Sequence, residues 1–184
     1  PEDVERMRKQ EAFDTIYTAL RSFRLFEGLS DDQIASVSTT SSLLRFSSGE
    51  SLVVQGETGD SMFLVRSGSL RVEVAPAGDP GAGSVVANLG PGDFFGEMSL
   101  LTGEPRSASV VAEGDVEVLR LTKDDFASVL STDASVVETL SAALEKRLAE
   151  NAKKTVSKSD GVKLDPHRTT RADILSRIRG FFGI

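Results

Sequence analysis

The sequence predicts an α+β fold, in which an eight-stranded antiparallel β jelly-roll-like barrel is flanked by N-terminal helices and C-terminal lid helices. Between residues 43 and 121, short β-branched or aromatic runs alternate with glycine-containing turns, as in "LLRFSSGESLVVQGETGDSMFLVRSGSLRVEVA". Short strands at this spacing favour a sandwich or barrel. On either side of this region, apolar residues instead recur every three or four positions, as in amphipathic helices.

The pattern divides the chain into four parts. They are an N-terminal helical segment (1–41), a β-barrel (42–122), hinge and lid helices (123–152), and a basic linker with a terminal amphipathic helix (153–184). A first helix is predicted over 3–24 and ends before Gly28. Ser30 and Gln33 have the spacing of a capping box, which predicts a second, short helix. Within the barrel, only "EMSLL" after Gly96 has a helical pattern.

Composition excludes several classes of function. The 184 residues contain no cysteine, so neither a disulfide nor a thiolate metal site can form. The one histidine, His167, lies in the polar linker, which argues against the clustered ligands of a metal-dependent barrel enzyme. No nucleophile–base pair stands out either, so we expect no catalysis and no metal.

The charge of the chain is uneven. Its net charge of −7 disfavours nucleic-acid binding over the whole surface, although residues 151–184 hold eight Lys or Arg against three Asp. No apolar run reaches the length of a membrane span. A first residue of proline rather than methionine predicts that the sequence is a piece of a longer chain.

The stretch 94–110, "FFGEMSLLTGEPRSASV", carries the clearest sign of a ligand site. Gly96 allows a tight turn into a short helix, whose first N–H groups, at residues 97–99, favour an anion. Arg106 can bind phosphate oxygens through paired hydrogen bonds, whereas Glu97 suits a sugar hydroxyl. Together these groups describe a small nucleotide site. A mutual salt bridge between Glu97 and Arg106 is the structural alternative.

The stretch "FGEMSLLTGEPRSASV" resembles the phosphate-binding cassette of cyclic nucleotide-binding domains, and the resemblance covers about residues 25–150. It implies that Glu97 accepts the ribose 2′-OH and that Arg106 pairs with the cyclic phosphate. It also implies a set of further ligand-binding residues. These are Gly96, Ser99, Ser107 and Ala108 near the phosphate and ribose, Leu89, Phe95 and Met98 along the base and sugar, and Arg147 as a lid over the base.

The resemblance implies a regulatory domain that binds a cyclic nucleotide, with cAMP favoured over cGMP, and needs no other cofactor. Similarity to bacterial channels of the small-conductance mechanosensitive type implies a cytoplasmic domain of an inner-membrane protein. In that setting the partner is a channel portion of the same polypeptide, and the protein would form a homo-oligomer through that portion. Nucleic acid is not expected as a partner. Two alternatives stay open: the sensor half of a transcription regulator of the catabolite activator type, and a non-binding protein-interaction domain.

Overall fold

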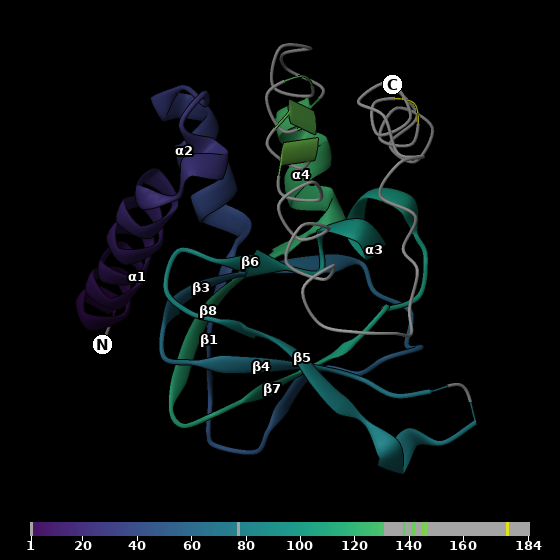
Figure 1. Ribbon diagram of the computed structural model, residues 1–184. Helices are drawn as coiled ribbons and strands as arrows, with labels where there is room; N and C mark the ends of the chain where they lie inside the picture. The colour runs from purple at the N-terminus through teal and green to yellow at the C-terminus, as the bar shows by residue number, and fades with distance from the viewer. Residues whose placement is uncertain are drawn as a thin grey trace.

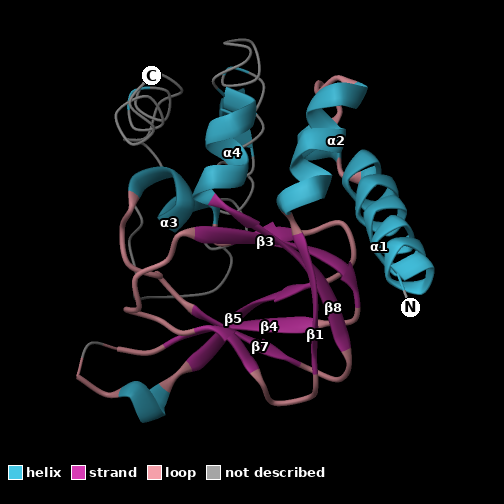
Figure 2. Ribbon diagram, turned by 180° about the vertical axis from the view of Figure 1, so that it is seen from behind, coloured by secondary structure: helices cyan, strands magenta, loops and turns pink. Residues whose placement is uncertain are grey.

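The computed structural model describes residues 2–76 and 78–130, together with Glu138, Ser141, Ala142, Glu145, Lys146 and Ser176. Two β-sheets lie one above the other, and the α-helices gather on the outer side of one of them (Figure 1). The view from behind shows the same arrangement (Figure 2). The architecture therefore has three layers: the α-helices pack on one sheet, and that sheet packs on the second sheet.

The N-terminal helices form as the sequence predicts. Helix α1 spans Glu2–Ser22, the 3-10 helix η1 Arg24–Phe26 and helix α2 Asp31–Thr40. The capping box of α2 is confirmed, because the Ser30 hydroxyl accepts from the Gln33 N–H and the Gln33 side chain accepts from the Ser30 N–H.

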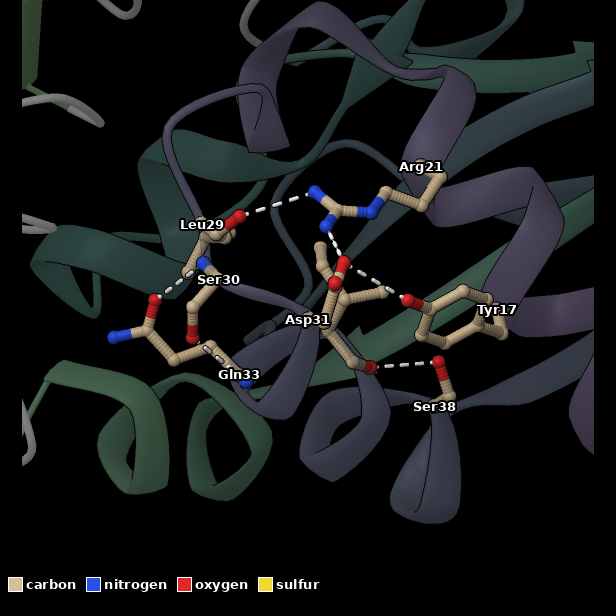
Figure 3. A network of polar contacts seen from close by, with 8 residues as sticks. Tyr17, Arg21, Leu29, Ser30, Asp31, Gln33 and Ser38 are labelled. Carbon is tan, nitrogen blue, oxygen red and sulfur yellow. Dashed lines mark hydrogen bonds and ion pairs between the residues drawn. The ribbon is translucent and has the colours of Figure 1, made fainter.

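A polar network joins α1 to the start of α2 (Figure 3). The Tyr17 hydroxyl donates to the Asp31 carboxylate at 3.1 Å, and Arg21 forms an ion pair with the same carboxylate. Arg21 also donates to the Leu29 carbonyl at 3.0 Å. These contacts hold the C-terminal half of α1 against the η1–α2 turn, so the two helices are tied as one unit.

Within the described residues, eight strands form two antiparallel sheets rather than one closed barrel. Their bounds are β1 Ser42–Phe46, β2 Ser51–Val53, β3 Ser61–Ser67, β4 Leu70–Val74, β5 Ser84–Leu89, β6 Phe94–Phe95, β7 Ser109–Ala112 and β8 Val116–Thr122. The strand orders are β1-β8-β3-β6 and β2-β7-β4-β5, and a 3-10 helix η2, Pro80–Ala82, lies between β4 and β5. The predicted number of strands and the jelly-roll-like α+β class are confirmed. The predicted closure into a barrel is not confirmed. Each sheet keeps two edge strands, which are β1 and β6 in one and β2 and β5 in the other.

Side chains of β3 and β8 alternate between two hydrophobic cores, as the period of a strand requires. Met62 and Leu64 of β3 pack with the helices, whereas Phe63 and Val65 pack against the second sheet. The helical core also includes Leu20 of α1 and Phe26 of η1, which are 0% and 1% exposed. Burial on both faces fixes the register of β3, because a shift by one residue would exchange its two faces.

Two further helices complete the described chain. Helix α3 spans Glu97–Thr102 and confirms the helix predicted after Gly96, and helix α4 spans Lys123–Leu130. A capping box opens α4: the Thr122 N–H donates to the Asp125 carboxylate and the Thr122 hydroxyl accepts from the Asp125 N–H. The predicted lid helix (133–152), linker and terminal helix lie outside the described residues, apart from isolated positions. None of the helices described here is long and apolar enough to cross a membrane.

Candidate nucleotide-binding site

Arg106 lies between α3 and β7, and its backbone is fixed by the loop that precedes β3. The Arg106 N–H donates to the Glu57 carbonyl, and the Gly56 N–H donates to the Arg106 carbonyl, both at 2.8 Å. This pair of hydrogen bonds joins two segments that are distant in sequence. The position of the Arg106 Cα therefore depends on the 56–59 loop as much as on the α3–β7 loop to which Arg106 belongs.

The Arg106 side chain is buried, with only 7% of its surface exposed, and it contacts mostly uncharged groups. Its Nη1 donates to the Gly96 carbonyl at 3.1 Å, and its Nη2 lies 3.5 Å from the Ser61 hydroxyl, at the long limit of a hydrogen bond. The Phe63 ring lies below the guanidinium, with its centroid 5.9 Å from Cζ. A cation held by a carbonyl, a hydroxyl and a ring keeps hydrogen-bonding capacity for an anionic ligand, since guanidinium has five N–H donors.

Burial lowers the pKa of the Arg106 guanidinium from its ordinary value, because the charged form loses water. The carboxylates of Asp60, Glu97 and Glu57 act in the opposite direction, while Arg120 adds to the lowering. An arginine stays charged at neutral pH in spite of such a shift. The site therefore presents a partly desolvated positive charge, which interacts with an anion more strongly than an exposed one would.

The turn that carries the site depends on two glycines with left-handed backbone conformation. Gly96 has φ 84° and is the N-cap of α3, and Gly103 has φ 72° and ends the helix with an N–H bond to the Ser99 carbonyl. Such values favour glycine over residues with a Cβ. The helix of six residues thus leads the chain away from Gly96, and the "TGEP" turn returns it so that Arg106 meets the Gly96 carbonyl.

The other predicted site residues differ in their exposure to solvent. Glu97 and Ser99 lie in α3 and are buried, at 9% and 3% exposure. Met98, Leu89 and Ala108 are half-buried, and Ser107 is exposed. Phe95 is 6% exposed and belongs to the core between the sheets, where it stacks on Phe63 with ring centroids 5.1 Å apart. Arg147 lies outside the described residues.

The structure brings Gly96, Glu97 and Arg106 together, and it adds three residues that the sequence did not indicate. Gly59, Ser61 and Phe63 come from the segment before and within β3, and all three contact or approach the Arg106 side chain. In the sequence, the glycines of "GETGDS" have the pattern of ordinary turn residues. The contact across 45 residues, between Arg106 and Ser61, arises from the tertiary structure and leaves no local pattern in the sequence.

Comparisons with known proteins agree on one family. The cyclic nucleotide-binding domain family matches residues 43–133. The chain is 36% identical over 126 residues to the cyclic AMP receptor protein of Thermus thermophilus, covering 68% of this chain and 57% of that protein. It is 43% identical over 94 residues to a cyclic nucleotide-gated potassium channel of Rhizobium etli, covering 50% of this chain and 24% of the channel.

Among solved structures, the regulatory domain of Toxoplasma gondii PKA with cAMP superposes with a TM-score of 0.65 at 27% identity, covering 77% of this chain and 51% of that one. The chain thus spans 57% or less of the length of each of these relatives. The matched region contains the two sheets apart from Ser42, the α3 turn and α4. Through residues 43–133, this chain belongs to the cyclic nucleotide-binding domain family.

Proposed function

We propose that this domain binds a cyclic purine nucleotide, cAMP in preference to cGMP, and passes the change in its conformation to the rest of a longer protein. One observation carries the proposal: within the part of the chain that the structure describes, the buried Arg106 contacts a carbonyl, a hydroxyl and a ring and forms no ion pair with a carboxylate. A phosphate would supply the anionic partner that such a guanidinium lacks in its immediate contacts. The family match and the PKA regulatory domain with cAMP support the nature of the ligand.

In the proposed complex, Arg106 pairs with the cyclic phosphate and the N–H groups at the start of α3 contribute further donors. Glu97, the first residue of α3, accepts the ribose 2′-OH. Ser107 is exposed beside Arg106, and in the proposed complex its hydroxyl contacts the phosphate or the base. Leu89 and Met98 provide apolar surface for the sugar and base, and Arg147 covers the base. A 5′-nucleotide would fit less well, because its phosphate carries an additional charge near Glu57, Asp60 and Glu97.

A continuous core connects the site to α1, which gives the proposed signal a route. Leu100 of α3 is fully buried in the helical core, which also contains Leu20 of α1 and Phe126 of α4. Phe126 in turn packs on Phe26, with ring centroids 6.1 Å apart. A ligand that displaces α3 must therefore repack this core, since protein interiors transmit rather than absorb changes of shape.

The longer protein, in this proposal, is a channel, with this domain on the cytoplasmic side of an inner membrane. The similarity to the Rhizobium etli channel supports it. The similarity to the cyclic AMP receptor protein favours a second candidate, a cAMP-dependent regulator without a channel. Ion flux through the complete polypeptide in liposomes, with and without cAMP, separates the two: flux that responds to cAMP supports the channel, and no flux supports the regulator.

Isothermal titration of the chain with cAMP, cGMP and 5′-AMP tests the binding proposal. We expect micromolar or tighter binding of a cyclic nucleotide, with cAMP tighter than cGMP and 5′-AMP much weaker. Equal affinity for cAMP and 5′-AMP would contradict the assignment of Arg106 to a cyclic phosphate. No binding of any of the three would favour a protein-interaction domain.

A further inference from the structure

We propose that Gly59, which lies outside the 94–110 segment, is a positioning residue for Arg106. Its missing side chain leaves a slot for the guanidinium, so that the arginine is already oriented when the nucleotide arrives. The consequence for affinity rests on the function proposed above, whereas the effect on Arg106 itself does not.

The distances around Gly59 show how tight this slot is. A Cβ at Gly59 would lie 2.2 Å from Nε, 2.3 Å from Cζ and 2.6 Å from Nη2 of Arg106. A Cβ at Gly96 would lie 2.6 Å from Nη1. Carbon and nitrogen atoms that are not bonded pack at about 3.5 Å or more, so neither position has room for a methyl group while Arg106 stays in place. Two glycines from different segments therefore border the same guanidinium.

Gly59 and Gly96 differ in one respect that makes Gly59 the better probe. Gly96 has φ 84° and a Cβ there would also lie 2.9 Å from the Ser61 carbonyl, so a side chain strains the backbone. Gly59 is not among the glycines with positive φ, and its three nearest contacts are all Arg106 side-chain atoms. Alanine at position 59 therefore conflicts first with the Arg106 side chain.

Arg106 cannot escape this conflict by moving as a whole. Its N–H and carbonyl are bound to Glu57 and Gly56, in the same loop as Gly59. Only the side chain can rotate away, and it would then lose the hydrogen bond to the Gly96 carbonyl and its place over the Phe63 ring. A guanidinium that must return to this geometry on binding costs affinity, because preorganisation is lost.

The ligand-free protein gives the first test, through the ¹⁵N–¹H resonance of the Arg106 Nε. Its assignment comes from its absence in Arg106→Lys. We expect Gly59→Ala to move or broaden this resonance, and the matched control Gly83→Ala to leave it unchanged. Gly83 has φ −60°, and a Cβ there would meet no atom closer than 4.0 Å. An unchanged Arg106 resonance in Gly59→Ala overturns the proposal.

The second test is a double-mutant cycle of cAMP affinity between positions 59 and 106. With Arg106 present, we expect Gly59→Ala to weaken binding about tenfold or more. In the Arg106→Lys background the same substitution should change affinity by less than about threefold, because the planar fork that fills the slot is absent. Equal losses in both backgrounds would show that Gly59 does not act through Arg106 and would overturn the proposal.

Stability provides a third measurement in case Gly59→Ala folds poorly. If the added methyl group lowers the melting temperature by contact with the guanidinium, Gly59→Ala should have no effect in the Arg106→Ala background, since the slot is then empty. A melting temperature of the double variant clearly below that of Arg106→Ala alone overturns the proposal. If the wild-type chain binds no nucleotide, the proposed function fails, while the resonance and the melting temperature still decide the role of Gly59.

Discussion

Arg106→Ala is the substitution that separates ligand binding from folding most clearly. In the proposed complex Arg106 makes two charge-assisted hydrogen bonds to the phosphate. Hydrogen bonds to charged groups contribute about 1.5–3 kcal/mol each, so their loss costs about 3–6 kcal/mol. At 1.4 kcal/mol for each factor of ten, cAMP affinity should fall by about two to four orders of magnitude.

The same substitution should change the stability of the ligand-free protein much less. It removes the hydrogen bond to the Gly96 carbonyl at 3.1 Å and the weak one to Ser61 at 3.5 Å. Each contributes about 1 kcal/mol, and relief from burying a charge opposes the loss. We therefore expect the free energy of unfolding to change by no more than about 2 kcal/mol.

Thermal unfolding with and without cAMP measures both effects in one experiment. At a concentration 100 times the wild-type Kd, ligand stabilises the folded protein by about 2.7 kcal/mol. The Arg106→Ala variant should show almost no ligand-induced shift in Tm at that concentration. A shift equal to that of the wild type would refute the role of Arg106 in binding. A variant that is unfolded without ligand would show that Arg106 serves the fold.

Three further substitutions test the account at other points. Glu97→Gln should weaken cAMP binding by about 1.5–3 kcal/mol and leave the affinity for 2′-deoxy-cAMP nearly unchanged, because that ligand lacks the 2′-OH. Equal losses for both ligands in titrations would contradict a contact between Glu97 and the 2′-OH. Phe26→Ala should lower the free energy of unfolding by about 3–5 kcal/mol in urea, since the ring is 1% exposed in the helical core; a loss below about 1 kcal/mol would show that this core is not well packed. Ser30→Ala should cost about 1 kcal/mol in the same assay, because it removes the capping box of α2, whereas Ser36→Ala, on the exposed face of that helix, should cost little.

Local features of the fold were predictable because short-range physics determines them. The capping box at Ser30 and Gln33, the short helix after Gly96 and the alternating strands all depend on residues within a few positions of each other. Strand pairing is different, since β1 pairs with β8 and β2 with β7 across most of the described chain. The sequence therefore indicated eight strands but not their division into two open sheets.

The candidate site divides in the same way. Gly96, Glu97 and Arg106 were recognisable from one stretch because a turn and a short helix bring them together. Gly59 and Ser61 were not, because their proximity to Arg106 arises from the tertiary structure. A glycine that is needed for space rather than for its backbone conformation resembles any turn glycine in a single sequence.

The central claim is that a cyclic phosphate binds at Arg106, and NMR titration of the ligand-free protein with cAMP tests it most directly. The account predicts saturable shifts of the Arg106 Nε resonance and of the Glu97, Ser107 and Ala108 amides, with the side chain of Arg45 as an internal control. Arg45 lies on β1, where it pairs with Glu117. Saturable binding that leaves the Arg106 resonance in place, or no shift at any of these positions, would contradict the account.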